Sequence, residues 1–254
     1  DDVESRGLGD VYKRQIYNQT KYIKDWAGYP VCEYTKTEYY PSGEELFLKM
    51  LEAVKEAENF IFLEYFIFED GIMLEQLLAA LEEKVKQGVE VRMIYDDVGC
   101  ISKLPAGYYK KMEARGIKCT AFNPFRPIMS IIMNNRDHRK ITVIDGKVGF
   151  TGGYNLADEY FNITHPYGYW KDTGVKLTGD AVKSLTASFL TMWNAIDHTD
   201  SQEAYDEYID ATDGTYNAAS QECYVQPYSD NPLGHDRIGE DLSLIHISEP
   251  TRLD

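Results

Sequence analysis

The sequence predicts an α/β domain with a mainly parallel sheet flanked by helices. Short apolar runs of strand length alternate with segments whose apolar residues recur at helical spacing, and Gly88 and Gly116 each end a helical segment. Strand, helix and strand in succession at this spacing imply right-handed crossovers, which place the strands parallel. The apolar content, 43% of 254 residues, is ample for the core of such a domain.

The first elements carry the clearest signals. Ser42-Gly-Glu-Glu45 has the form of a capping box, and apolar residues from Leu46 to Val54 share one face of the helix that it predicts. The nearly continuous apolar run 59–68 predicts a strand buried on both faces. The other predicted elements are helices over 72–87, 108–115 and 180–196 and strands over 89–95, 117–122, 140–144, 148–151 and 173–177.

The two ends of the chain are related to each other through DNA. Residues 242–252 can be encoded by a DNA stretch whose reverse complement translates as residues 5–15. Such a relation does not arise from protein physics, and the stretch resembles a transposase adapter used in sequencing-library preparation. We therefore expect residues 1–15 and 242–254 to be adapter-derived and non-native.

Between these ends we expect one domain and the beginning of another. Residues 16–218 are assigned to the first domain and 219–241 to the start of a truncated second domain. The stretch 197–220 is acidic and weakly patterned, which predicts a linker or surface excursion, and 224–232 resembles the entry into the second domain.

Composition disfavours several classes of function. The chain has 42 acidic and 26 basic residues, and this negative balance disfavours a nucleic-acid partner because such affinity comes largely from Lys and Arg. Cys32, Cys100, Cys119 and Cys223 are scattered without the close pairs of zinc sites, which favours reduced thiols. The sequence contains no run of about 18 apolar residues that could cross a membrane.

Five residues in the run 135–155 carry the chemistry. On a strand His138 and Lys140 share a face, and an imidazole beside an ammonium suits attack on a phosphodiester because the cation offsets oxygen charge. Gly153 lets the backbone approach a phosphate, and the Asn155 amide can donate a hydrogen bond to it. A His-x-Lys pair alone is weak evidence. The full pattern, in which Asp145 follows Lys140 after four residues and Gly-Gly-x-Asn follows after six more, is far more specific.

This pattern resembles the signature of the phospholipase D superfamily. Further runs look like bacterial cardiolipin synthases, so that the resemblance covers nearly all of 29–241. These runs are FLEYF at 62–66, YDDVG at 95–99, FNP at 122–124, NNRDHRKI at 134–141, NLADEY at 155–160 and WKDT at 170–173.

The resemblance implies a phospholipase D-like fold and a transfer that makes cardiolipin from two phosphatidylglycerol molecules. It gives His138 the role of nucleophile that forms a phosphohistidine, and Lys140, Gly153 and Asn155 the role of phosphate binding. Asp145 has an orienting or structural role, and Asp172 holds the nucleophilic imidazole. The implied chemistry needs neither metal nor cofactor.

The resemblance also implies partners and a location. The partners are phosphatidylglycerol, membrane lipid and a second phospholipase D-like domain that supplies the other histidine, with no nucleic acid. We expect the catalytic domain at the cell membrane, on the cytoplasmic side, with membrane spans upstream. The alternatives are a lipid hydrolase or nuclease of the same superfamily, which includes enzymes that dimerise to complete the site, and a noncatalytic lipid-binding module.

Several residues outside the motif have two readings. Asp96 and Asp97 fit either loop hydrogen-bond acceptors or, less well, a metal site. Glu64 fits either support of the active site or a buried, paired structural carboxylate. His165, His198 and His235 lack a motif and are expected at the surface.

The segment 122–133 is apolar and stands just before the motif. One reading is a lip that dips into the membrane interface, and the other is a loop packed on the second domain. The candidate membrane contacts are Phe125, Ile128, Ile131 and Ile132.

Overall fold

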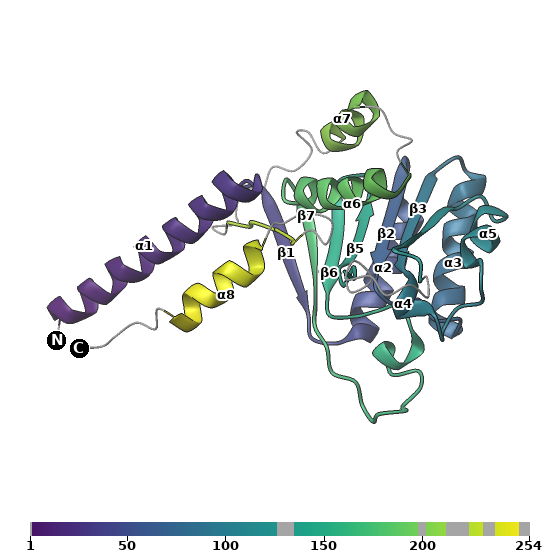
Figure 1. The fold of residues 1–254 in the computed structure, drawn as a ribbon, viewed down its shortest axis with the longest axis horizontal. Coiled ribbons are helices and arrows are strands. Elements are labelled where there is room, and N and C mark those ends of the chain that lie inside the picture. Colours follow the sequence, from purple (N-terminus) through teal and green to yellow (C-terminus); the bar gives the residue numbers. More distant parts are fainter. Residues whose placement is uncertain (1, 126–134, 198–201, 212–223, 231–236, 249–254) are drawn as a thin grey trace.

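The computed structural model describes residues 2–125, 135–197, 202–211, 224–230 and 237–248. Its centre is a seven-stranded sheet in the order β1-β7-β6-β5-β2-β3-β4 (Figure 1). The strands are β1 (Thr35–Tyr40), β2 (Phe60–Tyr65), β3 (Glu90–Asp96), β4 (Lys118–Phe122), β5 (Lys140–Ile144), β6 (Val148–Gly152) and β7 (Gly174–Gly179).

The α/β class is confirmed, but the sheet is mixed and not mainly parallel. Only β2–β3 and β3–β4 pair in parallel, whereas β1–β7, β7–β6, β6–β5 and β5–β2 are antiparallel. The physical reason is the short connection from β5 to β6, which has no room for a crossover helix. Asp145 and Gly146 occupy this turn with φ of 52° and 65°, the backbone that a tight hairpin requires.

Helices cover both faces of the sheet. On one face lie α2 (Gly43–Glu56), α3 (Ile72–Lys86), α5 (Tyr108–Glu113) and the 3₁₀ helix η2 (Asp158–Phe161). On the other face lie α6 (Val182–Asp197) and α7 (Gln202–Asp210). Two apolar cores result, one on each side of β2 and β5, because successive residues of a strand point to opposite faces.

Most of the predicted elements are present within a few residues of the expected bounds. Ser42 caps α2 by accepting a hydrogen bond from Glu45 N at 3.4 Å, as the capping box predicts. All six residues of β2 are buried, as expected for a strand covered on both faces. The strand β1 was not predicted because its sequence TKTEYY is polar, and it forms by antiparallel pairing with β7 at the sheet edge.

The expected linker 197–220 contains a helix that the prediction missed. Helix α7 packs its Tyr208 ring against Phe60 and Phe62 at 5.0 and 5.2 Å, and Arg92 Nη2 donates to the Tyr208 hydroxyl at 2.9 Å. The helix was missed because its acidic residues dominate the sequence, although Tyr205, Tyr208 and Ile209 form an apolar face at helical spacing. The rest of the expected linker after Ala211 lies outside the described residues.

Two helices lie beside the sheet domain. The long helix α1 (Asp2–Ala27) extends away from the sheet with α8 (Ile238–Ser248) next to it (Figure 1). Ile23, Ile238 and Leu242 form a small cluster between them, and the Tyr22 hydroxyl donates to Asp241 Oδ2 at 2.6 Å. Among the described residues, no helix is both long and apolar enough to cross a membrane.

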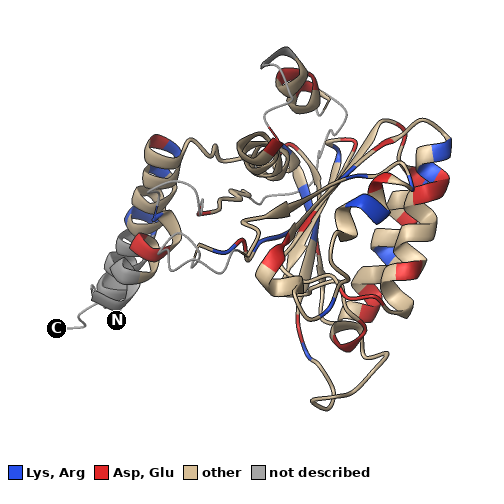
Figure 2. Cartoon of the chain, turned by 45° about the vertical axis from the view of Figure 1, so that its right-hand side comes forward, with Lys and Arg blue, Asp and Glu red and all other residues tan. Residues whose placement is uncertain are grey.

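Acidic and basic residues are interspersed over the helices and strand ends (Figure 2). Many basic residues stand beside an acidic partner, such as Arg115 with Glu82 at 2.9 Å and Lys118 with Glu90 at 2.5 Å. The described cysteines, Cys32, Cys100 and Cys119, are free and buried, whereas Cys223 lies outside the described residues.

Candidate active site

The residues of the motif other than Asp145 gather where β2, β3 and β4 have their carboxyl ends, which is called the carboxyl edge of the sheet below. Because β2, β3 and β4 are parallel, their carboxyl ends at Tyr65, Asp96 and Phe122 lie at the same edge. Since β5 is antiparallel to β2 and pairs Lys140 with Tyr65, this strand begins at that edge. Gly152 ends β6 there and pairs with Gly174 at the start of β7. Ligands of open α/β sheets commonly bind outside this edge.

His138 lies just before β5 and Lys140 is its first residue, and both side chains lie near the ring of Phe66. Lys140 Nζ donates a hydrogen bond to the His138 carbonyl oxygen at 2.7 Å and lies 5.6 Å from the Phe66 ring centroid. The His138 ring lies 4.9 Å from the same ring. The predicted proximity of the imidazole and the ammonium is therefore present in the fold.

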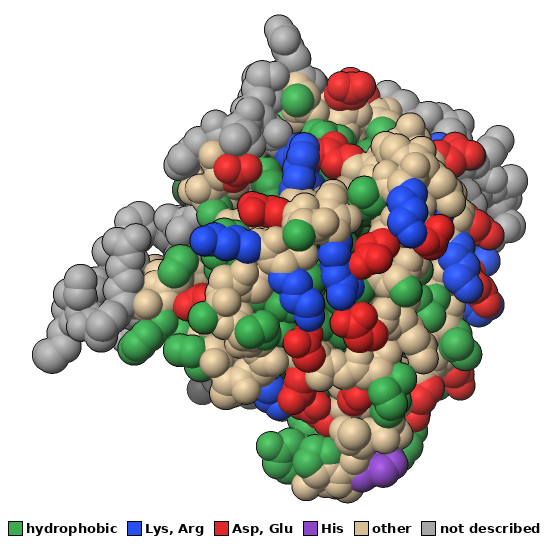
Figure 3. Space-filling model, turned by 90° about the vertical axis from the view of Figure 1, so that its right-hand side faces the viewer, with side chains coloured by type: hydrophobic (Ala, Val, Ile, Leu, Met, Phe, Trp, Pro, Cys, Tyr) green, Lys and Arg blue, Asp and Glu red, His purple; other side chains and the backbone are tan. Residues whose placement is uncertain are grey.

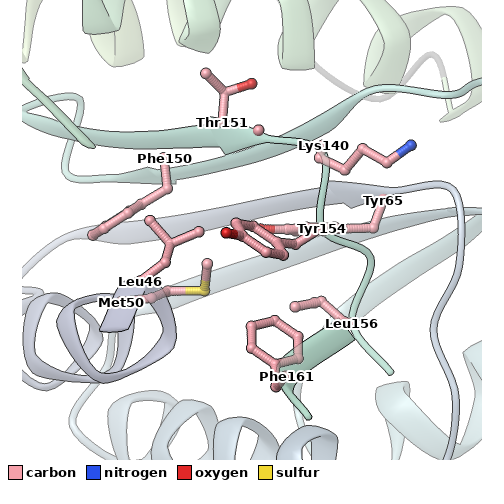
Figure 4. Close-up of a pocket in the computed structure, with 10 residues that line it drawn as sticks. Leu46, Met50, Tyr65, Lys140, Phe150, Thr151, Tyr154, Leu156 and Phe161 are labelled. Atoms are coloured by element: carbon pink, nitrogen blue, oxygen red, sulfur yellow. The ribbon is translucent and has the colours of Figure 1, made fainter. Parts of the chain in front are cut away.

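The stem of Lys140 is enclosed by apolar side chains. It lines a small cavity of about 10 Å³ together with Leu46, Met50, Tyr154 and others, and its ammonium points away from this apolar group (Figure 4). Burial lowers the pKa of Lys140 to about 8, an effect that the carboxylates of Asp137 and Asp172 oppose. The ammonium is thus a fixed and poorly hydrated cation, which is suited to a phosphate oxygen.

His138 is exposed at the sheet edge, where a ligand can reach it. Partial burial and the neighbouring Lys140 ammonium lower the pKa of His138, while the carboxylates of Asp137 and Asp96 oppose this shift. The lowered pKa favours the neutral imidazole at neutral pH. Only the neutral ring has a free nitrogen lone pair that can attack phosphorus.

A cavity of about 180 Å³ opens beside His138 and Lys140. Its other walls come from Thr151 and Gly152 at the end of β6, from Leu185 and Ser188 of α6, and from residues 227–229. The segment 224–230, which resembled the entry into a second domain, thus returns to the candidate site. Its backbone pairs with the segment that precedes β1. Cys32 N donates to the Val225 carbonyl oxygen at 2.8 Å, and Val225 N donates to the Cys32 carbonyl oxygen at 2.9 Å. Sequence reasoning gave no sign of this return.

Gly153, Asn155 and Asp172 line the β6 and β7 side of the edge. A Cβ at Gly153 would lie only 2.0 Å from Asp172 Oδ1, so glycine is required for the carboxylate to occupy its position. Asn155 is buried, and its Oδ1 accepts from Ile67 N at 3.0 Å, which fixes the amide orientation. Asp172 Oδ1 accepts from Thr173 N at 2.7 Å, and in the described chain no carboxylate accepts a hydrogen bond from the His138 ring.

Asp145 is not brought to the site. It follows β5, at the opposite end of the strand from Lys140. Its Oδ1 accepts from Asn59 N and Phe60 N at 2.7 and 2.9 Å, and its Oδ2 accepts from Glu58 N at 2.8 Å. All of its partners are backbone amides at the start of β2. Of the two roles expected for Asp145, orienting or structural, these contacts support the structural one.

A buried ionic cluster lies beneath the motif. Arg139 pairs with Glu64, and its Nε lies 3.1 Å from Asp137 Oδ1. Burial and the Asp137 charge raise the pKa of Glu64 well above its ordinary value, and Arg139 opposes this. The reading of Glu64 as a buried, paired carboxylate holds, and the pairing also anchors the motif. Sequence reasoning passed over Arg139, which directly precedes β5 in a polar run that gives no sign of a buried partner.

Asp96 and Asp97 act as acceptors for loops. Asp96 accepts from Gly99 N and Asp137 N, both at 3.0 Å, and lies 3.3 Å from Arg136 Nη1. Asp97 Oδ2 accepts from Phe125 N at 2.7 Å. In the described ranges no group of three or more His, Cys, Asp and Glu residues could hold a metal ion.

The remaining candidates fall at the edge or outside the described residues. Phe125 follows β4 and is 53% exposed, whereas Ile128, Ile131 and Ile132 lie outside the described residues. His165 is exposed on the loop 162–170, and His198 and His235 lie outside the described residues.

An exposed imidazole, an enclosed ammonium and an oriented amide at the carboxyl edge of an α/β sheet define a candidate site for phosphodiester chemistry. Residues 50–193 match the family model described as "Cardiolipin synthase, PLD-like domain". The chain belongs to this phospholipase D-like family of cardiolipin synthases.

Individual relatives agree with this assignment. The chain is 44% identical to a Streptococcus mutans protein described as uncharacterized, over 91% of this chain and 49% of that protein. It is 38% identical to cardiolipin synthase 1 of Staphylococcus epidermidis, over 66% of this chain and 34% of the enzyme. It thus spans half or less of the length of these relatives. NucT from Helicobacter pylori is similar in structure, with a TM-score of 0.47 and 14% identity over 64% of this chain and 98% of that one, which is too distant to support any argument.

Proposed function

We propose that residues 16–218 form the first catalytic domain of a phosphatidyltransferase that makes cardiolipin from two phosphatidylglycerol molecules. The observation that carries the proposal is the arrangement of His138 beside the Lys140 ammonium at an open cavity. The membership of the chain in the cardiolipin synthase family supports the choice of a lipid phosphodiester as substrate.

In the first step the neutral His138 ring attacks phosphorus of phosphatidylglycerol. The bond from phosphorus to the glycerol oxygen breaks, and a proton passes to that oxygen. Glycerol is released, and the phosphatidyl group stays on His138 as a phosphatidyl-histidine. Lys140 and the Asn155 amide offset charge on the phosphate oxygens, and Gly153 lets the backbone approach them. Asp172 orients the nucleophilic imidazole once the site is complete.

In the second step a hydroxyl of another phosphatidylglycerol attacks the phosphohistidine. Its proton leaves to a base, the bond from phosphorus to His138 breaks, and cardiolipin forms. The acid of the first step and the base of the second are one group on the far side of phosphorus from His138. We propose that a second phospholipase D-like domain, beginning at 219–241, supplies it as a histidine.

The substrate also places the reaction. Both phosphatidylglycerol molecules reside in a bilayer, so we propose that the domain works at the membrane, on the cytoplasmic side. The segment beginning at Phe125 remains a candidate contact, and the exposure of Phe125 supports this. The negative balance of charge supports a lipid over a nucleic acid as the phosphodiester.

The test is covalent trapping in the full-length enzyme. Labelled phosphatidylglycerol is added, the reaction is quenched, and peptides are sequenced by mass spectrometry. We expect the phosphatidyl group on His138 and no adduct in a His138→Ala variant, with His165→Ala as the matched control. Product analysis on the same samples separates the transferase from a hydrolase, because a transferase yields cardiolipin and glycerol whereas a hydrolase yields phosphatidic acid. A label on another histidine, with His138 unmodified, would reverse the assigned roles.

A further inference from the structure

The loop 162–170 is a projecting finger at the same sheet edge as the candidate site. It connects η2 to the start of β7 and extends beyond the strand ends as the long loop at the bottom of Figure 1. Two strand spacings, roughly 10 Å, separate the start of β7 from the start of β5. The base of the finger therefore lies beside the cavity that His138 and Lys140 line.

The finger is closed at its base by a pair of reciprocal hydrogen bonds. Asn162 Nδ2 donates to the Trp170 carbonyl oxygen at 2.9 Å, and Trp170 N donates to Asn162 Oδ1 at 2.7 Å. Asn162 has a φ of 53°, a left-handed conformation that asparagine tolerates better than most residues. The Trp170 ring packs on Tyr160 at 4.5 Å, which joins the base to the core. The base of the finger is thus held in place by hydrogen bonds and by ring packing.

The finger exposes aromatic side chains to solvent. Tyr167 and Tyr169 are 79% and 67% exposed, and Ile163 is 39% exposed. The chain turns between the two tyrosines at Gly168, whose φ is 86° and which has no neighbour near a would-be Cβ. The Tyr167 ring touches the Trp170 ring, with 6.1 Å between the ring centroids, but both tyrosines stay mostly exposed, and exposed aromatic rings on a fixed base indicate a contact surface.

Charge is distributed unevenly along the finger. Residues 160–171 contain no Asp or Glu, although the chain has 42 acidic residues in total. In Figure 3 the protrusion at the bottom shows hydrophobic side chains and a histidine but no acidic or basic side chain at its tip. Acidic residues gather beside its base, where a hollow of about 310 Å³ separates them from the finger's own Thr164, Pro166 and Tyr167. The acidic residues that line this hollow are Glu69, Asp70, Asp158 and Glu159, with Lys103 among them.

We propose that the finger 162–170 inserts the rings of Tyr167 and Tyr169 into the interface of a lipid bilayer beside the active site. This inference rests on the proposed function, since a lipid substrate brings the candidate site to a bilayer. Tyrosine suits the interface because its ring is apolar and its hydroxyl can remain among headgroups. The acids at the base resist burial in hydrocarbon, so they limit insertion to the tip.

The composition of the tip favours a bilayer over a protein partner. A headgroup interface accepts rings without a complementary shape, whereas a protein contact of useful strength needs a larger buried area. The tip offers only two strongly exposed rings on one narrow loop. Docking on the second phospholipase D-like domain is the competing outcome of the test.

The first experiment measures binding of the chain to vesicles of phosphatidylglycerol and phosphatidylcholine by co-sedimentation. The double variant Tyr167→Ser/Tyr169→Ser should bind the vesicles about tenfold more weakly. It lacks the two rings whose apolar area leaves water when the finger enters the bilayer interface. The control Tyr34→Ser/Tyr224→Ser changes two tyrosines that are 52% and 72% exposed outside the finger, and it should bind like the unsubstituted chain. Equal thermal stability of the variants excludes an effect of unfolding.

A second experiment locates the tip directly. A Tyr167→Trp variant should be quenched by lipids with bromine on the upper acyl chain, whereas a Tyr34→Trp variant should not. No binding of the unsubstituted chain, or unchanged binding of the finger variant, overturns the proposal. So does a finger variant that loses association with the second domain but keeps its vesicle binding. Because trapping on His138 can be run in detergent micelles, its failure tests the proposed function separately from the finger.

Discussion

Arg139, the residue between His138 and Lys140, forms an ion pair with Glu64 on the opposite face of the sheet from Lys140. Arg139 directly precedes β5, and its Nη1 donates to the carbonyl oxygen of Ser188 in α6 at 3.5 Å, so its side chain faces the α6 side. Asp137 joins the pair through Arg139 Nε at 3.1 Å. The motif is therefore held in place through Arg139, while His138 and Lys140 line the cavity of the candidate site.

This arrangement predicts unequal effects of removing the two partners. Glu64→Gln should cost less unfolding free energy than Arg139→Gln, because burial raises the pKa of Glu64 and so lowers the free energy lost with its charge, and glutamine can still accept a hydrogen bond. Arg139→Gln should cost about 3–5 kcal/mol, because it leaves buried carboxyl groups without a cation. Urea unfolding of the chain near neutral pH measures both losses of stability, and equal losses would contradict this asymmetry.

Lys140 is predicted to reduce stability. Its pKa falls from 10.5 to about 8 on folding, so the ammonium form costs the folded state about 3 kcal/mol. The cost is fully present below pH 8, where both states are protonated, and vanishes as pH rises past 10.5. Lys140→Met should therefore stabilise the chain at pH 7 and lose this advantage at high pH. Lys55→Met, an exposed control, should show no such trend in thermal unfolding.

The same ionisation should govern phosphate binding. Affinity for a dialkyl phosphate, whose charge is constant in this range, should decline as pH rises through about 8, because the cation is lost. Titration calorimetry on the chain measures this decline. A Lys140→Arg variant that still binds should keep its affinity to higher pH, since arginine stays charged. Affinity that is flat from pH 7 to 9 in the unsubstituted chain would exclude Lys140 as the phosphate-binding cation.

Asp145 is predicted to matter for folding and not for chemistry. Asp145→Ala removes the acceptor for three backbone amides and should cost about 2–4 kcal/mol of stability. At a temperature where the full-length variant is folded, trapping of the adduct on His138 should proceed at an unchanged rate. Glu58→Ala serves as the control, because the Glu58 side chain is exposed and only its backbone N–H donates to Asp145. A stable variant that fails to form the adduct would return Asp145 to the site.

Asp172 is predicted to act through the nucleophile. In the full-length enzyme Asp172→Asn should leave the fold intact and slow adduct formation by roughly a hundredfold, as loss of an orienting carboxylate does in other histidine enzymes. The pH at which activity begins to rise should also shift, which a purely structural role would not cause. Asp180→Asn, at the opposite end of β7, is the matched control. Loss of stability with an unshifted pH profile would favour a structural role.

The chain by itself is predicted to lack sustained turnover. One histidine cannot act both as nucleophile and as acid on opposite sides of phosphorus, and His138 is the one histidine that the described residues bring to the site. Purified chain with phosphatidylglycerol should give no accumulating cardiolipin by chromatography. Accumulation would mean that two copies dimerise into a complete site, which light scattering would reveal.

The local sequence determined the elements and the identity of the site. The capping box at Ser42, the apolar run of β2 and the pattern from His138 to Asn155 each depend on neighbours within a few residues, so they can be read without a fold. The spacing of His138 and Lys140 predicted a common face on a strand, although β5 begins only at Lys140. The capping box and β2 were confirmed, and His138 and Lys140 lie close together, whereas Asp145 does not join them.

The tertiary structure decided which distant groups meet. The antiparallel pairing of β5 with β2 places Lys140 at the carboxyl edge and sends Asp145 to the other end. The polar strand β1 and the acidic helix α7 take their form from long-range packing, which local propensity does not encode. The pairing of Arg139 with Glu64 and the return of residues 227–229 to the cavity also join segments far apart in the chain. Burial and charge at such contacts depend on chain crossings, and only the folded molecule fixes them.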